Sequence, residues 1–251
     1  MTSPRTTTTP TTRNRAPAAR PLVLIAHGTR APGAEPLLPL VADDVARLLP
    51  GAEVRHGYVE FSSPSAADAL SGTVDPVVVP FFLGGGYHVE HDLPRLVSAH
   101  GTGTVTRHLG PEPDLVSGVV ERLTEQLVSE GADWQDVDAL VLAAAGTRRT
   151  SGVAEAREAA RHVEMMTGVR TSAAFLSAAE PSVRAAVHAL HQEGAEVVAL
   201  ATYLLAEGHF SRALHGAGAE LVAPPIGHHH SLADVVVRRY LEQVEPPRET
   251  S

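Results

Sequence analysis

The sequence contains no cysteine and no lysine, so all 20 of its basic residues are arginine. The absence of cysteine excludes disulfides, thiolate metal sites, iron–sulfur clusters and a cysteine nucleophile. The absence of lysine excludes Schiff-base chemistry and the lysine of a phosphate-binding P-loop. Metal binding is therefore left to the 14 histidines and to carboxylates.

Aromatic residues and positive charge are also scarce. Aromatic side chains make up 4% of the 251 residues, and the formal net charge is −9. Nucleic-acid binding needs a basic stripe and aromatic side chains on which bases stack, so we expect no nucleic-acid partner.

Long hydrophobic runs are missing as well. The longest apolar runs, 22–26 and 137–145, are far shorter than the roughly 20 residues that span a bilayer, so we expect no membrane span. Residues 1–20 are rich in Thr, Pro and Arg and lack the apolar segment of a secretory signal. We predict that they form a disordered tail and that the protein is cytoplasmic.

Short apolar runs alternate with longer amphipathic stretches along the chain, a pattern typical of a parallel sheet with crossover helices. Strands are predicted at 21–26, 53–59, 75–81, 103–107, 138–144, 170–176, 196–202 and 219–222. Helices are predicted at 35–49, 64–70, 92–99, 113–129, 153–167, 181–193, 209–216 and 231–243. The sequence therefore predicts an α/β fold.

The second half of the chain repeats the first at an offset of about 118 residues. Residues 22–30 (LVLIAHGTR) match residues 140–148 (LVLAAAGTR), and His88 matches His209. A period this long is too large for a solenoid and fits two four-stranded α/β halves that face each other. We predict the units in chain order as a tail at 1–20, a half at 21–129, a linker at 130–136, a half at 137–243 and a tail at 244–251.

Three candidate catalytic and metal-binding residues follow the first three predicted strands. His27 lies in the turn after the first strand, Glu60 ends the second, and His88 follows the third through the glycines 84–86. The carboxyl ends of neighbouring parallel strands meet at one edge, so these side chains are expected in one cleft. Two imidazoles and a carboxylate suit iron, cobalt, nickel or zinc better than magnesium or calcium. Taken singly, a strand-end histidine can equally cap or pack, and a triple glycine can simply let a loop bend.

The segments His27-Gly-Thr-Arg30, Glu60 and 79–94 (VPFFLGGGYHVEHDLP) closely resemble the sirohydrochlorin chelatases, the class II tetrapyrrole chelatases of siroheme and cobalamin synthesis. The resemblance covers roughly residues 21–243 in a tandem two-half form. It implies two flavodoxin-like halves, each a four-stranded parallel sheet with flanking helices, around a cleft. It also implies that His27, Glu60 and His88 bind the metal and carry the chemistry.

The second half departs from that pattern. Ala145 stands in place of the first histidine and Ser177 in place of the glutamate, while His209 remains. One competent metal site per chain is therefore expected.

The resemblance implies the insertion of a divalent metal into a tetrapyrrole, with release of two pyrrole protons. Fe²⁺, giving siroheme, is favoured, while Co²⁺ or Ni²⁺ for cobalamin-type cofactors stays open because the same ligands accept all three. The metal is a substrate, and no prosthetic group is expected. Arginines would pair with the carboxylates of the tetrapyrrole. The residues expected to contact the substrate are Arg30, Gly84, Gly85, Gly86, Tyr87, Arg148 and His209.

Other interpretations stay open. A metal-binding or tetrapyrrole-binding protein without insertion activity would carry the same ligands. A nucleotide-binding module is poorly supported, because residues 27–33 lack the three-glycine spacing of a dinucleotide site. The histidines 228–230 are interpreted as a solvated helix start rather than a metal site. A monomer could complete the cleft, and a homodimer is an open alternative.

Overall fold

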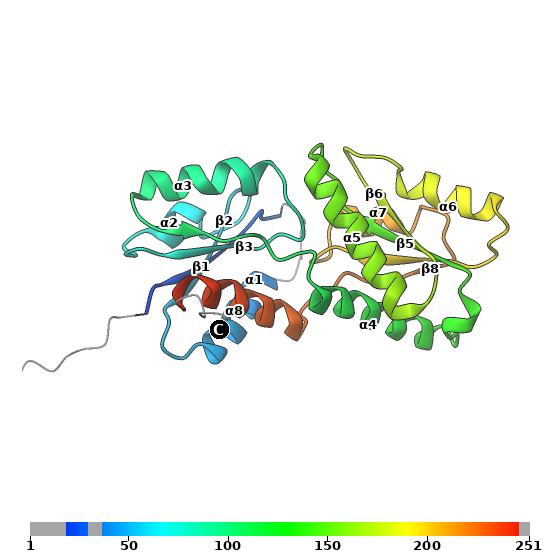
Figure 1. The fold of residues 1–251 in the computed structure, drawn as a ribbon, viewed down its shortest axis with the longest axis horizontal. Helices are drawn as coiled ribbons and strands as arrows, with labels where there is room; N and C mark the ends of the chain where they lie inside the picture. Colours follow the sequence, from blue (N-terminus) through cyan, green and yellow to red (C-terminus); the bar gives the residue numbers. More distant parts are fainter. Residues whose placement is uncertain (1–18, 30–36, 246–251) are drawn as a thin grey trace, which may run out of the picture.

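Each half of the chain forms a four-stranded parallel sheet in the computed structural model, which describes residues 19–29 and 37–245 (Figure 1). The first sheet has the order β2-β1-β3-β4 and the second the order β6-β5-β7-β8. This is the strand order of flavodoxin-like folds, so the predicted pair of tandem flavodoxin-like halves is confirmed. The strands are β1 (Leu22–Ala26), β2 (Val54–Tyr58), β3 (Val77–Pro80), β4 (Thr104–Val105), β5 (Ala139–Ala144), β6 (Thr171–Phe175), β7 (Val198–Tyr203) and β8 (Leu221–Val222).

Each predicted helix is present, with ends that differ by a few residues from those expected. Two short turns were not predicted: the π-helical turn η1 (His88–Asp92) and the 3₁₀ turn η2 (Trp134–Asp136), which lies in the expected linker. The helices are α1 (Leu37–Leu48), α2 (Ala66–Leu70), α3 (Leu93–His100), α4 (Pro113–Ser129), α5 (Thr150–Thr167), α6 (Val183–Gln192), α7 (His209–Leu214) and α8 (His230–Val244).

Local sequence explains most of these boundaries. Ser65 caps α2 in a reciprocal box with Asp68, and Ser182 caps α6. Pro113 begins α4, at a position where its missing N–H has no intrahelical partner. Strands β3, β5 and β7 are buried along their whole length and β1 along most of it, which explains why they consist of continuous apolar runs.

The repeat extends to the turns that follow the first strand of each half. Gly28 and Gly146 both have φ of +94°, and a Cβ at either would lie 1.8 Å from a carbonyl oxygen, that of Glu60 or that of Ser177. The N–H of Glu60 donates to the carbonyl of His27 at 2.9 Å, and the N–H of Ser177 to that of Ala145 at 3.0 Å. Glycine is required at both turns, and positions 27 and 145 are equivalent in space as well as in sequence.

The two halves exchange their last helices. Helix α4 packs on α5, β7 and β8 of the second half, whereas α8 packs on α1 and β3 of the first (Figure 1). One hydrophobic cluster accordingly contains residues of both halves, including Leu24, Leu123, Leu140 and Val236. The predicted boundaries follow the repeat along the chain, but in space each half is completed by a helix from the other.

A buried arginine joins α8 to the segment that crosses between the halves. The side chain of Arg239 has no exposed surface. It donates to the carbonyls of His108 and Leu109, both at 3.0 Å, and to Glu112 Oε1 at 2.6 Å. Residues 108–112 lead from β4 into α4, so this contact fixes α8 against the crossing segment.

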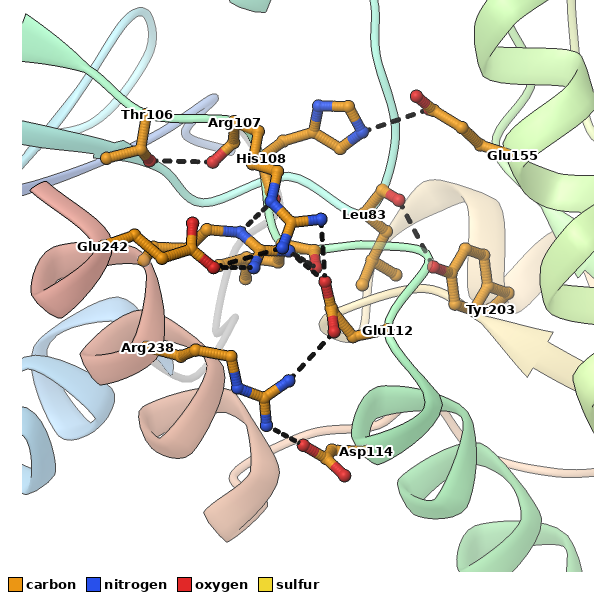
Figure 2. A network of polar contacts seen from close by, with 12 residues as sticks. Leu83, Thr106, Arg107, His108, Glu112, Asp114, Glu155, Tyr203, Arg238 and Glu242 are labelled. Carbon is orange, nitrogen blue, oxygen red and sulfur yellow. Dashed lines mark hydrogen bonds and ion pairs between the residues drawn. The ribbon is translucent and has the colours of Figure 1, made fainter. Parts of the chain in front are cut away.

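Glu112 is the centre of a wider ionic network, shown in Figure 2. Besides Arg239, the carboxylate pairs with Arg238 at 2.9 Å and with Arg107 at 3.1 Å. Burial opposes ionisation of Glu112, but the hydrogen bond and charge of Arg239 and the other guanidinium groups hold its pKa below the usual range. The network therefore places an ionised carboxylate among three arginines.

The predicted tails are described only in part. Residues 1–18 and 246–251 lie outside the described residues. Arg20, which the sequence placed in the first tail, is instead held in place: its Nε lies 2.9 Å from Asp75 Oδ2, and its carbonyl accepts a hydrogen bond from Tyr240 at 2.8 Å. Helix α8 continues to Val244, at the start of the second predicted tail. Across the described ranges, no helix has the length and apolar character needed to cross a membrane.

Candidate functional site

A cavity of about 680 Å³ lies between the two halves, at the carboxyl ends of the strands. The first half lines it with residues 26–29, 58, 62–63 and 81–88, and the second half with residues 144–147, 152, 156, 175 and 203–206; Leu37 and Leu38 of α1 complete it. Most of these side chains are apolar or small. Within the described part of the chain, His27 and His88 are the lining residues that carry an imidazole, a side chain able to bind a metal or accept a proton.

The two histidines lie next to each other at this cavity. Their ring centroids are 4.6 Å apart, and the ring planes are nearly perpendicular. His88 Nδ1 lies 2.6 Å from Asp92 Oδ2, and His27 Nδ1 lies 3.3 Å from the carbonyl oxygen of Gly28. A carboxylate and a carbonyl can only accept, so Nδ1 of each ring carries the hydrogen. In the neutral rings the lone pair is then on Nε2, where it is free to bind a metal or a proton.

The chain after β3 explains how His88 reaches this position. The glycines at 84–86 turn the chain out of the sheet, and η1 then begins at His88. In this π-helical turn the N–H of Leu93 donates to the carbonyl of His88, and π-helical turns are frequent at functional sites. The turn also places His88 and Asp92, four residues apart, on one face. The sequence shows this spacing, but the role of Asp92 was not predicted from it.

Glu60 reaches the same strand end without joining the two histidines in the cavity. Its N–H is bonded to the carbonyl of His27, but its side chain is exposed and does not line the cavity. Phe61 follows, with its ring centroid 5.6 Å from that of His27. No group of three His, Asp or Glu side chains in the described ranges is close enough to hold a metal. The role of Glu60 as a third ligand remains a prediction.

The predicted substrate-binding residues divide into three sets. Gly84, Gly85, Gly86 and Tyr87 line the cavity. Arg148 and His209 are exposed and do not line it, and Arg30 lies outside the described residues. On the opposite wall, Ala145 lines the cavity at the position equivalent to His27. Among the described lining residues, the two imidazoles therefore both come from the first half.

The other histidine-rich segments have partners within the protein. His91 Nε2 accepts a hydrogen bond from Arg149 at 2.5 Å, so this nitrogen is not free to bind a metal. His228 pairs with Asp44 at 2.6 Å, and His229 with Glu121 at 2.9 Å. His229 also caps α8 and is buried, whereas His228 and His230 are exposed, so the predicted helix start is confirmed and its solvated character holds for two of the three histidines.

Comparison with known proteins identifies the family. The sequence model of CbiX matches residues 21–126 and again residues 139–243, once in each half. This chain belongs to the CbiX family. The family match covers both halves, and it confirms the resemblance to the sirohydrochlorin chelatases.

One relative and two solved structures illustrate the likeness of this CbiX-family chain. A protein of Methanosarcina barkeri named sirohydrochlorin cobaltochelatase is 32% identical over 91 residues, which are 34% of this chain and 70% of that protein. The structure of SirB from Bacillus subtilis with Fe³⁺ has a TM-score of 0.75 at 18% identity and covers 89% of this chain and 95% of that one. The sirohydrochlorin chelatase SirB from Bacillus subtilis subspecies spizizenii in complex with cobalt has a TM-score of 0.71 at 16% identity, covering 91% and 97%. At such identities the two structures show a common fold.

Proposed function

We propose that this CbiX-family protein inserts a divalent metal ion into sirohydrochlorin. The observation that carries the proposal is the pair of adjacent imidazoles, His27 and His88, at a cavity whose other lining residues, among those the structure describes, carry no charge; in the same described ranges the Nε2 of each ring has no hydrogen-bond partner. In the reaction two pyrrole N–H bonds break, the pyrrole nitrogens bind the metal, and two protons leave. Neutral imidazoles can both present a metal ion and accept a proton at neutral pH. Glu60 is proposed to assist by accepting a proton or orienting a histidine.

The cavity supports this assignment. Its volume of about 680 Å³ is in the range typical of small-molecule sites, and its apolar walls suit the flat face of a macrocycle. The glycines 84–86 allow the backbone to come close to that face. Both walls come from one chain, so a monomer suffices to form the site. We propose that Arg30 and Arg148 bind the charged substituents of the macrocycle.

Fe²⁺, giving siroheme, is the metal we propose first, and Co²⁺ is the alternative. SirB is known with Fe³⁺ in one structure and with cobalt in the other, so it supports both metals, and the name of the Methanosarcina barkeri relative supports cobalt. Imidazole nitrogen accepts either metal, so the donor set does not select between them. A competition assay with both metals, in the absence of oxygen, would decide the order of preference.

The proposal is tested by mixing purified protein, sirohydrochlorin and Fe²⁺ or Co²⁺ anaerobically and following the change in absorbance. We expect insertion to proceed faster than in the same mixture without protein. A protein that binds the macrocycle and metal but leaves the rate at the protein-free value would be a carrier, and the enzymatic proposal would then be rejected.

The hydrogen bond from His88 to Asp92 leads to a prediction about tautomers. In an Asp92→Asn variant the side-chain amide can donate to His88 Nδ1. The ring hydrogen then moves to Nε2, and this nitrogen no longer has a lone pair with which to bind a metal or a proton. Changes of this kind in groups that orient metal-binding histidines typically cost 10- to 100-fold, so we expect kcat/KM to fall by roughly that factor. The matched control is Asp234→Asn, at an exposed position on α8 that does not line the cavity. Equal activity in the two variants would show that Asp92 does not orient His88.

A further inference from the structure

The second half of the chain contacts the segment that carries His88 on both sides of its glycine loop, defined here as residues 84–86. Ahead of the loop, the hydroxyl of Tyr203 donates to the carbonyl of Leu83 at 3.3 Å (Figure 2). After the loop, Arg149 Nε lies 3.2 Å from Glu90 Oε2. Within the loop, the N–H of Gly85 donates to Glu155 Oε2 at 2.7 Å. Side chains of β7, of α5 and of the turn before α5 therefore hold this part of the first half.

We propose that Glu155 is a positioning residue that holds the glycine loop, and through it His88, in place over the cavity. The proposal rests on the function proposed above. Glycines have no side chains to pack and lose more conformational freedom on ordering than other residues, so the loop depends on anchors to its backbone. The bond from Gly85 to Glu155 has an ionised acceptor, and such bonds are about twice as strong as neutral ones.

The packing of α5 against the loop supports this role. A Cβ at Gly84 or Gly85 would have Glu155 Oε2 as its nearest neighbour, at 3.4 and 3.6 Å. One turn earlier on α5, a Cβ at Gly152 would lie 2.6 Å from the carbonyl oxygen of Gly85. Glycine at 152 thus lets the helix come close enough for Glu155 to reach the loop.

The surroundings of Glu155 keep its carboxyl ionised. Its side chain is 23% exposed, and Oε2 lies 3.1 Å from His108 Nε2 (Figure 2). Burial alone would raise the pKa of Glu155, but the contact with His108 and the hydrogen bond from Gly85 hold it below the usual value. The acceptor is therefore charged at neutral pH.

The anchor that Glu155 provides, like the histidine pair, has no counterpart at the equivalent position of the other half. In the ungapped alignment that pairs Gly28 with Gly146, the first-half partner of Glu155 is Leu37. The leucine side chain offers no hydrogen-bond acceptor, so position 37, where the described part of α1 begins, provides no matching anchor. The second half lacks the histidine at 145 but retains the group that orders the loop of the first.

The test compares Glu155→Leu, which keeps the size but removes the acceptor, with Glu155→Gln, which keeps an acceptor oxygen. Glu158→Leu is the matched control, because Glu158 is exposed on the same helix and does not line the cavity. A small displacement of a reacting group can cost about 100-fold, so we expect Glu155→Leu to lower kcat for metal insertion roughly 10- to 100-fold. We expect KM for sirohydrochlorin to change little, Glu155→Gln to restore most of the activity, and Glu158→Leu to match the wild type.

Hydrogen exchange of the amides in residues 83–92 supplies a readout that does not depend on turnover. We expect faster exchange there in Glu155→Leu and unchanged exchange in Glu158→Leu. If the wild-type protein inserts no metal but exchange is faster in Glu155→Leu, the proposed function is rejected while the anchoring of the loop by Glu155 stays supported. Unchanged exchange and unchanged kcat in Glu155→Leu would overturn the inference. So would a fall in kcat that follows lost thermal stability and is not rescued by Glu155→Gln, because Glu155 would then be merely structural.

Discussion

Metal insertion is expected to be lost when either His27 or His88 is replaced by alanine, with the fold retained. In the described part of the chain these are the cavity-lining residues that carry an imidazole, a side chain able to bind a metal or accept a proton. Positioned acid–base groups typically contribute 10²- to 10⁴-fold to a rate, so each variant should retain at most about 1% of the wild-type kcat. Both imidazoles are partly exposed and belong to neither sheet, so little packing is lost.

The measurement is the anaerobic insertion assay, with circular dichroism and thermal unfolding to confirm that each variant is folded. His215→Ala serves as the matched control, since His215 is exposed after α7 and outside the cavity. If both His27→Ala and His88→Ala kept their turnover, the assignment of the site would be wrong. If one variant kept it, the chemistry would belong to the other histidine alone.

The largest expected effect on stability comes from Arg239→Ala. This change leaves the carbonyls of His108 and Leu109 without their donor and deprives Glu112, whose side chain is 13% exposed, of its closest guanidinium. Breaking a buried ion pair by removing one partner typically costs 3–5 kcal/mol, and because Glu112 keeps two other arginines we expect a loss of about 3 kcal/mol. For a protein of this size that corresponds to a fall in Tm of roughly 6–12 °C.

Urea and thermal unfolding measure this loss, and Arg157→Ala, an exposed position on α5, is the control. A double variant, Arg239→Met with Glu112→Gln, should recover part of the stability because it removes the buried charge together with its partner. A change in Tm in Arg239→Ala no larger than in Arg157→Ala would mean that the network around Glu112 does not stabilise the fold.

The sequence predicted the two sheets, the eight main helices and the meeting of His27 with His88. These predictions succeeded because apolar periodicity and position at a strand end are local signals, and the topology of a parallel sheet then brings the strand ends together. Glu60 illustrates the limit of this reasoning. A strand end fixes where the backbone lies, but the side chain of Glu60 is exposed and lies outside the cavity lining.

Contacts between residues far apart in the chain could not be predicted in the same way. Glu155 and Gly85 are 70 residues apart, and nothing near either position indicates the other. The exchange of α4 and α8 is equally hidden, because an amphipathic helix shows which face is buried but not which sheet it covers. The pairing of His88 with Asp92 was accessible through the four-residue spacing, yet it required knowledge that residues 88–92 form a helical turn.

Because the two halves exchange helices α4 and α8, the architecture of this chain resembles a helix-swapped homodimer whose two subunits have been joined into one chain. In a symmetric pair of identical chains, any substitution at one wall of a shared cavity appears at both walls. Joining the copies removes that constraint, so alanine can stand at 145 while histidine stays at 27, and Glu155 can face a loop that its own half does not contain. Each sheet is covered by a helix from the other half, so folding depends on both halves even where their cavity residues differ.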